Sequence, residues 1–253
     1  MGLFDFFRKS KEARPIFEVL GTDMHNHLVP NVDDGSKSIE ETLQCLKTLQ
    51  SVGYKKAYIT PHFQSPRFPN TEEDILQRYA EVKEVAQNAG LDIELLGAGG
   101  EYRLDGGFVE RVQPRKLLTF GNNIASDKGY LLVELSMHQN VPRVELIMEA
   151  MQDRGYNVVL AHPERYAYLN IDGMFMEKIK KMGVLLQVNV LSLDGFYGSV
   201  PMQRGYELIE RGWVELLGTD THNMLYGQAL INASRNKKIE RILEKHIFLN
   251  SDL

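Results

Sequence analysis

The chain has 253 residues, of which 43% are hydrophobic and 25% charged, and its net charge is -5 at pH 7. This length suits one α/β barrel with a well-buried core, and the composition excludes a disordered chain. Mild acidity without a block rich in lysine and arginine excludes non-specific binding to nucleic acid, and no apolar run is long enough for a transmembrane helix. A single cysteine, Cys45, fits a reducing compartment, so we expect a cytoplasmic protein.

Residues 1–15 are expected to form an N-terminal extension ahead of a single domain over residues 16–253. Within residues 1–11, large apolar side chains precede basic ones, as in a short amphipathic segment. Two interpretations stay open: a loose terminus that docks on the domain, or a weak contact with a membrane or a partner. The second would hold the protein at the inner face of the membrane.

From residue 16 onward, short aliphatic runs alternate with helical patterns, which predicts a mostly parallel sheet wrapped by helices. The expected strands are Ile16–Gly21, Lys56–Thr60, Ile93–Gly97, Tyr130–Leu135, Asn157–Ala161, Val184–Asn189 and Trp213–Gly218. Ser38 with Glu41 forms a capping box for the helix of residues 39–50, and Thr71 begins the next helix. Seven strand–helix units favour a barrel, with an open doubly wound sheet as the alternative.

Imidazole and carboxylate side chains follow six of these seven strands, and the sixth strand supplies none. They are His25, His27 and Asp34 after the first strand, His62 after the second, Glu101 after the third, Glu134 in the fourth, His162 after the fifth, and Asp220 and His222 after the seventh. The carboxyl ends of barrel strands meet at one face, so we expect one cluster there. Each residue alone would also fit an ordinary hydrogen-bonding role, but together they predict two or three metal sites.

Imidazole mixed with carboxylate suits manganese, iron or zinc better than magnesium. Two further histidines, His138 and His246, do not follow a strand end and are expected at the surface or in packing contacts. Cys45 lies in the middle of a predicted helix, where we expect a buried and unreactive thiol.

Six motifs spread over residues 22–223 carry a family resemblance: "DMHNHLVPNVDDGSKSIEE", "ITPHF", "GGEYRLD", "LVELS", "LAHPERY" and "LGTDTHN". The chain resembles the polymerase and histidinol phosphatase (PHP) superfamily. Within it, the combination of "VDDG" with "HPERY" resembles the bacterial manganese-dependent protein-tyrosine phosphatases of capsular and exopolysaccharide synthesis. The resemblance implies a distorted seven-stranded barrel with three divalent ions, of which Mn²⁺ is favoured and iron or zinc are alternatives.

The resemblance also implies a role for each motif residue. The first ion would be held by His25, His27, Glu101 and Asp220, the second by Glu101, Glu134 and His162, and the third by Asp34, His62 and His222. Arg165 would bind the phosphate and act in catalysis beside Glu101 and Asp220. We expect Glu164, which points elsewhere from the same turn, to be a structural partner. The family's second phosphate-binding arginine is missing, since Gln228 stands in that region. Either another cation such as Arg67 or Arg103 supplies its charge, or phosphate is held less tightly.

The function implied is hydrolysis of phosphotyrosine by a metal-activated water. The substrate would be a phosphotyrosine protein, such as a bacterial tyrosine kinase that regulates capsule or exopolysaccharide synthesis. Two alternatives stay open: a phosphomonoesterase for a small molecule, such as a histidinol phosphatase, and a non-catalytic binding module.

Overall fold

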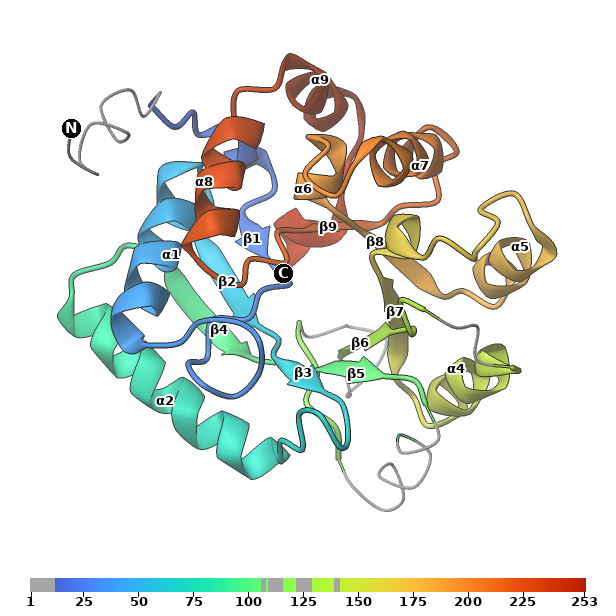
Figure 1. The fold of residues 1–253 in the computed structure, drawn as a ribbon, viewed down its shortest axis with the longest axis horizontal. Helices are drawn as coiled ribbons and strands as arrows, with labels where there is room; N and C mark the ends of the chain where they lie inside the picture. Colours follow the sequence, from blue (N-terminus) through green and yellow to red (C-terminus); the bar gives the residue numbers. More distant parts are fainter. Residues whose placement is uncertain (1–11, 106–107, 109–115, 122–128, 139–141) are drawn as a thin grey trace.

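The computed structural model describes residues 12–105, 108, 116–121, 129–138 and 142–253, and within these ranges the strands form two parallel sheets. One sheet has the order β1-β2-β4 and the other the order β3-β5-β6-β7-β8-β9. The strands are β1 (Thr22–Asp23), β2 (Lys56–Ile59), β3 (His62–Phe63), β4 (Glu94–Ala98), β5 (Glu101–Arg103), β6 (Tyr130–Glu134), β7 (Asn157–Ala161), β8 (Leu185–Asn189) and β9 (Leu216–Gly218). The α/β class with parallel strands is therefore confirmed (Figure 1).

The described strands occupy seven strand positions, the number expected from the sequence, because β2 with β3 and β4 with β5 each form one interrupted strand. The chain runs from β2 into β3 and from β4 into β5, and β2 pairs with β4 just as β3 pairs with β5. Each of these two strands is interrupted once. Pro61 interrupts the first because it has no N–H for the ladder. Gly100 interrupts the second, where an added Cβ would lie 2.7 Å from the rings of Phe63 and Tyr102.

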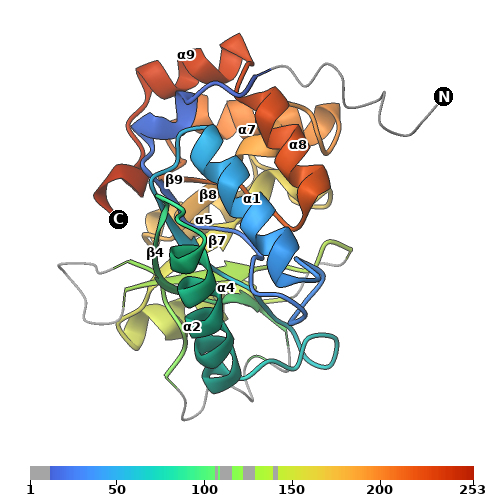
Figure 2. The same cartoon turned by 90° about the vertical axis from the view of Figure 1, so that its left-hand side faces the viewer.

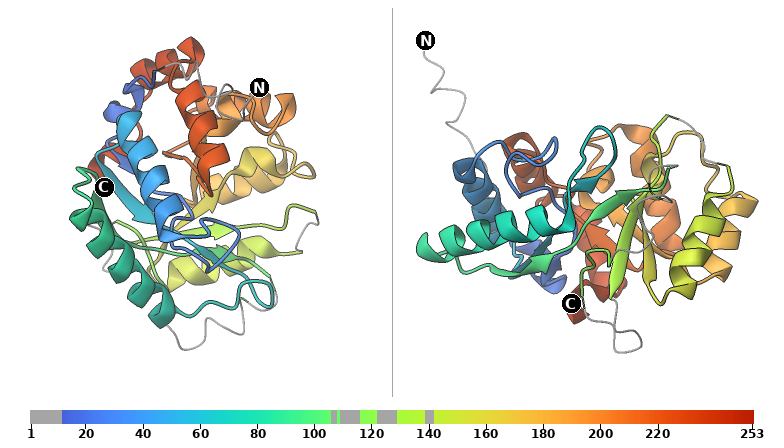
Figure 3. Two further views of the ribbon diagram at one scale, coloured as in Figure 1. Left: turned by 60° about the vertical axis from the view of Figure 1, so that its left-hand side comes forward. Right: turned by 90° about the horizontal axis from the view of Figure 1, so that it is seen from below.

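Helices surround the strands in every view (Figures 1 and 3). They are α1 (Ile39–Ser51), α2 (Glu72–Asn88), α4 (Val144–Asp153), α5 (Met174–Lys181), α6 (Val190–Leu193), α7 (Ser199–Glu210), α8 (Met224–Ala233) and α9 (Lys237–Lys245). The predicted N-caps are confirmed, because the Ser38 and Thr71 side chains accept hydrogen bonds from the backbone N–H groups of Glu41 and Asp74. Figure 2 shows α1 packed beside α8.

The first expected strand, Ile16–Gly21, is wrong. Residues Ile16–Val19 form a 3₁₀ helix (η2), and β1 begins only at Thr22. Phe17 and Leu20 are buried three residues apart while Val19 is 57% exposed, which is a helical and not an alternating pattern. A short apolar run does not distinguish the two by periodicity. The seventh expected strand is shortened to β9, and residues 1–11 of the predicted extension lie outside the described part of the chain.

Side chains join β1 to β9, which have no ladder between them in the described residues. Asp23 accepts hydrogen bonds from the backbone N–H and hydroxyl of Thr219, at 3.0 and 2.8 Å. A parallel bridge links Asn26 to Thr221 just beyond the two strands. At the opposite end, Asn250 in the terminal 3₁₀ helix η4 (Leu249–Asp252) bonds both strands. The first and last strands therefore meet through polar contacts at both of their ends.

No helix in the described ranges is both long enough and apolar enough to cross a membrane.

Candidate metal centre

His25 and His27 leave the end of β1 with their rings held in one orientation each. Backbone bonds tie this segment to the end of β9, because Asp220 N–H donates to His25 O and His27 N–H donates to Thr221 O. The Nδ1 atom of His25 lies 2.9 Å from Gln187 Oε1, and that of His27 lies 2.8 Å from Asp33 Oδ2. Both partners are acceptors, so each Nδ1 carries the proton and each Nε2 presents a lone pair.

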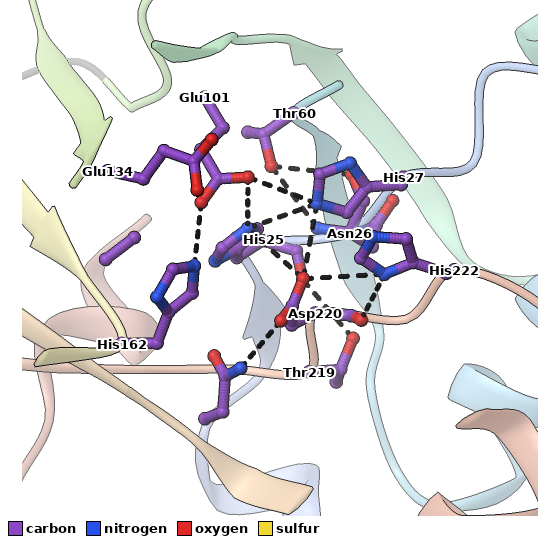
Figure 4. A network of polar contacts seen from close by, with 12 residues as sticks. His25, Asn26, His27, Thr60, Glu101, Glu134, His162, Thr219, Asp220 and His222 are labelled. Atoms are coloured by element: carbon purple, nitrogen blue, oxygen red, sulfur yellow. Dashed lines mark hydrogen bonds and ion pairs between the residues drawn. The ribbon is translucent and has the colours of Figure 1, made fainter. Parts of the chain in front are cut away.

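These two Nε2 atoms face the carboxylates of Glu101 and Asp220. His27 Nε2 lies 3.2 Å from Asp220 Oδ1 and 3.4 Å from Glu101 Oε2. His25 Nε2 lies 3.3 Å from the same Glu101 oxygen, and the two Nε2 atoms are 3.3 Å apart. All four residues are buried, and Figure 4 shows their side chains pointing toward one another. Two imidazole lone pairs and two carboxylates that converge without a donor between them form a cation-binding arrangement.

His62 and Glu134 border the same centre from β3 and β6. His62 Nδ1 lies 2.9 Å from Glu101 Oε2 and 3.3 Å from Glu134 Oε1. His162, directly after β7, places Nε2 at 2.9 Å from Glu101 Oε1. Glu101 therefore lies between the two histidines, with one oxygen toward each, as a bridging carboxylate would.

Asp34 and His222 complete the cluster at its exposed side. His222 Nδ1 lies 2.8 Å from the backbone oxygen of Asp220, which leaves its Nε2 to face Asp34 Oδ1 at 3.6 Å. His62 Nε2 lies 3.5 Å from the same oxygen. Asp34 also forms an ion pair with Arg67 at 3.1 Å, and its side chain is 42% exposed. The structure thus brings all nine sequence-predicted ligand residues to one cluster at the strand ends.

Buried polar atoms without a hydrogen bond test whether this cluster fits metal ions. In the described part of the chain, Asp34 Oδ1, His62 Nδ1, Glu101 Oε2 and His162 Nδ1 are buried and make none. Such atoms are costly unless an ion or a water satisfies them. Four overlapping groups of three residues could each hold an ion: His27, His62 and His222; His25, Glu101 and His162; His25, His27 and Asp220; and His62, Glu101 and Glu134. The residues present therefore fit divalent cations.

Opposite charges within the cluster stabilise each other. Burial raises the pKa of Glu101 and of Asp220, but the neighbouring imidazoles outweigh it and hold both pKa values well below their usual range. Burial lowers the pKa of His62, yet Glu101 and Glu134 raise it to about 10. Carboxylates that stay ionised in a buried centre supply the negative charge that compensates bound cations.

Two cluster residues have an unusual backbone. His162 and Asp220 have φ angles of 34° and 53°, in the left-handed region that residues other than glycine seldom adopt. His162 directly follows β7, and Asp220 lies two residues after the end of β9. Backbone strain of this kind is concentrated at functional sites.

A cavity of about 230 Å³ opens above the cluster. Its described lining residues are Asp34, His62, Gln64, Arg67, Arg103, Glu134, Met137, His162, Arg165, Asp220, His222, Asn223 and Tyr226. Arg165, in the 3₁₀ helix η3 (Pro163–Arg165), donates from Nη1 to Asp220 Oδ2 at 2.7 Å. Arg103 Nε donates to Glu134 Oε1 at 2.9 Å. An anion in this cavity would meet both guanidinium groups beside the cluster of potential ligands.

Several residues outside the cluster also bear on the predictions. Glu164 is buried and accepts bonds from Asn189 N–H and the Ser192 hydroxyl, so its predicted structural role is confirmed. Cys45 is buried in α1, as predicted, and burial raises its pKa to about 12. His138 is exposed, and His246 is half-buried near Phe248. Gln228 is exposed on α8, and the described lining residues do not include it.

Sequence reasoning missed the residues that orient the cluster. Asp33 stands beside Asp34 in "VDDG", and it accepts bonds from His27 and from the backbone N–H of His62. Gln187 bonds His25, while Asn189 Nδ2 donates to Asp220 Oδ2 at 2.7 Å. The last two residues alternate along β8, the strand that supplies no ligand. Polar residues at i and i+2 in an otherwise apolar buried strand share one face, and that pattern was the signal.

Residues 21–250 match the model of a protein family described as capsular polysaccharide synthesis, CpsB/CapC. The chain belongs to this family. Among CpsB/CapC relatives, the tyrosine-protein phosphatase CpsB of Streptococcus pneumoniae is 29% identical over 208 residues, which cover 80% of this chain and 83% of that protein. The tyrosine-protein phosphatase YwqE of Bacillus subtilis is 24% identical over 203 residues, covering 80% and 77%. The resemblance expected from the motifs is confirmed.

Solved structures agree in fold with this CpsB/CapC chain. A structure from a study of YwqE from Bacillus subtilis and CpsB from Streptococcus pneumoniae, described as metal-dependent tyrosine phosphatases, matches with a TM-score of 0.76 at 21% identity, covering 89% of this chain and 87% of that one. A lactonase from Listeria monocytogenes matches with a TM-score of 0.57 at 13% identity, covering 95% and 97%. At these identities the likeness is one of fold.

Proposed function

We propose that this chain is a metal-dependent protein-tyrosine phosphatase of capsular or exopolysaccharide synthesis. The observation that carries the proposal is a cavity lined by Arg165 and by six of the nine potential ligand residues, above the buried His25, His27 and Glu101. The family relatives named as tyrosine-protein phosphatases support the same activity. The small-molecule phosphatase and the non-catalytic module are not favoured, since the relatives named are protein phosphatases and the ligand set is complete.

We assign three divalent ions to the cluster, with Mn²⁺ favoured over iron and zinc. His25, His27, Glu101 and Asp220 would hold the first, Glu101, Glu134 and His162 the second, and Asp34, His62 and His222 the third. The contacts of Glu101 with histidines on both of its oxygens support a bridging role. Bound divalent ions would supply an acidified water as nucleophile and neutralise charge on the phosphoryl group.

The chain's own residues bind and orient the phosphate. Arg165 uses Nη1 for Asp220, and in the described residues its Nε and Nη2 make no hydrogen bond, so these donors are available to phosphate oxygens. Such donors stabilise the charge that develops in the transition state. Arg103 and Arg67 line the same cavity and can supply the second positive charge. Glu101 and Asp220 orient the surrounding imidazoles and complete the catalytic set.

No thiolate chemistry is needed. Cys45 is buried in α1 with its sulfur 3.8 Å from that of Met224, and it does not line the described cavity. A phenolate is a good enough leaving group to depart with modest acid assistance. This agrees with a substrate whose phosphate is carried on a tyrosine.

We further propose that the substrate is a phosphotyrosine protein, a bacterial tyrosine kinase that regulates polysaccharide synthesis. The protein would act in the cytoplasm, where a single free cysteine is stable. Residues 1–11 could then bring it to the inner face of the membrane. The proposed phosphatase activity does not depend on the identity of this substrate or on the location of the protein.

Metal dependence is tested directly by turnover. With Mn²⁺, we expect hydrolysis of p-nitrophenyl phosphate and of phosphotyrosyl peptides, and exhaustive treatment with EDTA should abolish it, because the ligand set contains oxygen and nitrogen only. Histidinol phosphate serves as the control substrate and should be turned over much more slowly. Vanadate-sensitive activity that survives chelation would contradict the metal mechanism, and preference for histidinol phosphate would favour the small-molecule alternative.

A further inference from the structure

Tyr197 lies beneath the guanidinium group of Arg165. The Cζ atom of Arg165 is 4.1 Å from the centroid of the Tyr197 ring. Tyr197 belongs to the turn between α6 and α7, and its ring makes an edge contact with Phe196 at 5.0 Å between centroids. This turn follows β8, which supplies no predicted ligand. None of the proposed metal sites requires a tyrosine here.

A second contact joins Tyr197 to the same guanidinium through Asp220. Asp220 Oδ2 accepts from Arg165 Nη1 at 2.7 Å, from Asn189 Nδ2 at 2.7 Å and from the Tyr197 hydroxyl at 3.3 Å. Asp220 Oδ1 faces the imidazoles, with His27 Nε2 at 3.2 Å. One carboxylate therefore links the cluster to Arg165, and Tyr197 contacts both the carboxylate and the guanidinium.

We propose that Tyr197 is a positioning residue that fixes the plane of the Arg165 guanidinium. The inference rests on the proposed role of Arg165 in binding phosphate. A single hydrogen bond to Asp220 leaves the guanidinium free to rotate about that bond, and arginine side chains have many rotamers. An aromatic face beneath the group removes this freedom by a cation–π contact. Nε and Nη2 are then held toward the cavity before phosphate arrives.

Two substitutions separate the ring from the hydroxyl. Tyr197→Phe keeps the face beneath Arg165 and should retain kcat/KM within about threefold. Tyr197→Leu removes the face and should lower kcat/KM for phosphotyrosyl peptide by about tenfold, and weaken the binding of inorganic phosphate to the Mn²⁺-loaded protein by a similar factor. Metal content should be unchanged in both. Tyr197→Met, which keeps the length of the side chain, replaces Tyr197→Leu if the latter folds poorly.

A double-mutant cycle distinguishes positioning from general support of the site. In an Arg165→Ala background, Tyr197→Leu should change kcat/KM and phosphate binding by less than about twofold, because the group that it orients is gone. Phe196→Leu is the matched control: it removes the neighbouring ring of the same turn, which does not contact Arg165 in the described residues, and its effect should be small and independent of Arg165. An equal tenfold loss from Tyr197→Leu with and without Arg165 would overturn the inference.

The phosphate-binding measurement keeps the two proposals apart. If the parent protein turns over no phosphomonoester, the proposed function fails, while calorimetry with inorganic phosphate still tests Tyr197. A Tyr197→Leu protein that binds phosphate as tightly as the parent overturns the positioning role, even if the enzyme is active. A parent protein that binds no phosphate overturns it as well, because Arg165 would then have no anion to receive.

Discussion

At the scale of single residues, Arg165 differs from the potential metal ligands around it, because its guanidinium group offers hydrogen-bond donors and no lone pair for a metal ion. Arg165→Ala should keep its metals and fold while kcat/KM falls by about 30- to 1000-fold for every phosphomonoester, the value of a charge-assisted contact that strengthens in the transition state. We expect the loss toward the upper end, because the second phosphate-binding arginine that the family resemblance implies is missing from the region of Gln228. Arg165→Lys should recover little, because an ammonium group cannot reproduce two parallel hydrogen bonds.

Steady-state kinetics and elemental analysis on the same samples test this prediction. Arg211→Ala is a suitable control, since it removes an exposed guanidinium that pairs with Asp172 outside the cavity. His162→Ala should lower both metal content and rate, unlike Arg165→Ala. A metal-replete Arg165→Ala enzyme with near-normal kcat/KM would show that Arg165 only forms an ion pair with Asp220.

Cys45 provides the opposite case, a reactive residue type with no expected role in the chemistry. Cys45→Ser should leave kcat/KM within about twofold, because the thiol is remote from the strand ends and a hydrolytic mechanism needs no thiolate. Burial raises the pKa of this thiol to about 12, so the native protein should also react slowly with an aromatic disulfide reagent at pH 8. Loss of activity with the fold intact would point to a covalent mechanism.

At the scale of elements, the contact between β1 and β9 depends on a few side chains. Asn250 accepts from the backbone N–H of Leu217 at 2.9 Å and donates to the backbone oxygens of Leu217 and Thr22. All of these groups are buried. Asn250→Ala would leave a buried backbone N–H and two carbonyls unpaired, so we expect a loss of about 2–4 kcal/mol in the free energy of unfolding.

Urea denaturation measures this loss. The neighbouring Ser251→Ala variant is the control: Ser251 is exposed and its hydroxyl bonds only the backbone oxygen of Phe248 among the described residues, so its effect should stay within about 0.5 kcal/mol. Equal stabilities of the two variants would mean that η4 does not hold the first and last strands together.

At the scale of the whole molecule, metal binding should couple to global stability. The cluster draws side chains from both sheets, so an ion ties together segments from Asp34 to His222. An ion present at about 100 times its dissociation constant adds about 2.7 kcal/mol, which for a chain of this size is a rise in Tm of roughly 5–10 °C. Adding Mn²⁺ to the EDTA-treated protein should produce this rise.

Thermal scans with Mn²⁺ and with EDTA provide the measurement. His246→Ala should keep the full rise, because His246 lies near Phe248 and away from the cluster. His162→Ala should reduce it. A Tm that is identical with and without metal would argue against the cluster as a metal centre.

The division into an extension of residues 1–15 and a single domain over 16–253 stays a prediction.

The sequence by itself determined the helices with clear caps, six of the seven expected strands and the nine side chains that gather at the strand ends. These features are local: Ser38 and Thr71 cap helices within three residues, and each predicted ligand lies in or close after its own strand. Barrel geometry alone then brings strand ends together. Cys45 was equally predictable, because its place in a helix is set by neighbours in the chain.

Only the tertiary structure decided how the side chains at the strand ends are oriented and which segments they join. Whether Ile16–Val19 forms a strand or a 3₁₀ helix depends on the burial of Phe17 against Tyr54, which lies far along the chain. Gln187 fixes His25 across 162 residues, and Asn189 and Tyr197 share one oxygen of Asp220 with Arg165. The spacing of Gln187 and Asn189 shows that they share a face of β8, but the partners of these side chains depend on where separate strands come to lie once the core has packed.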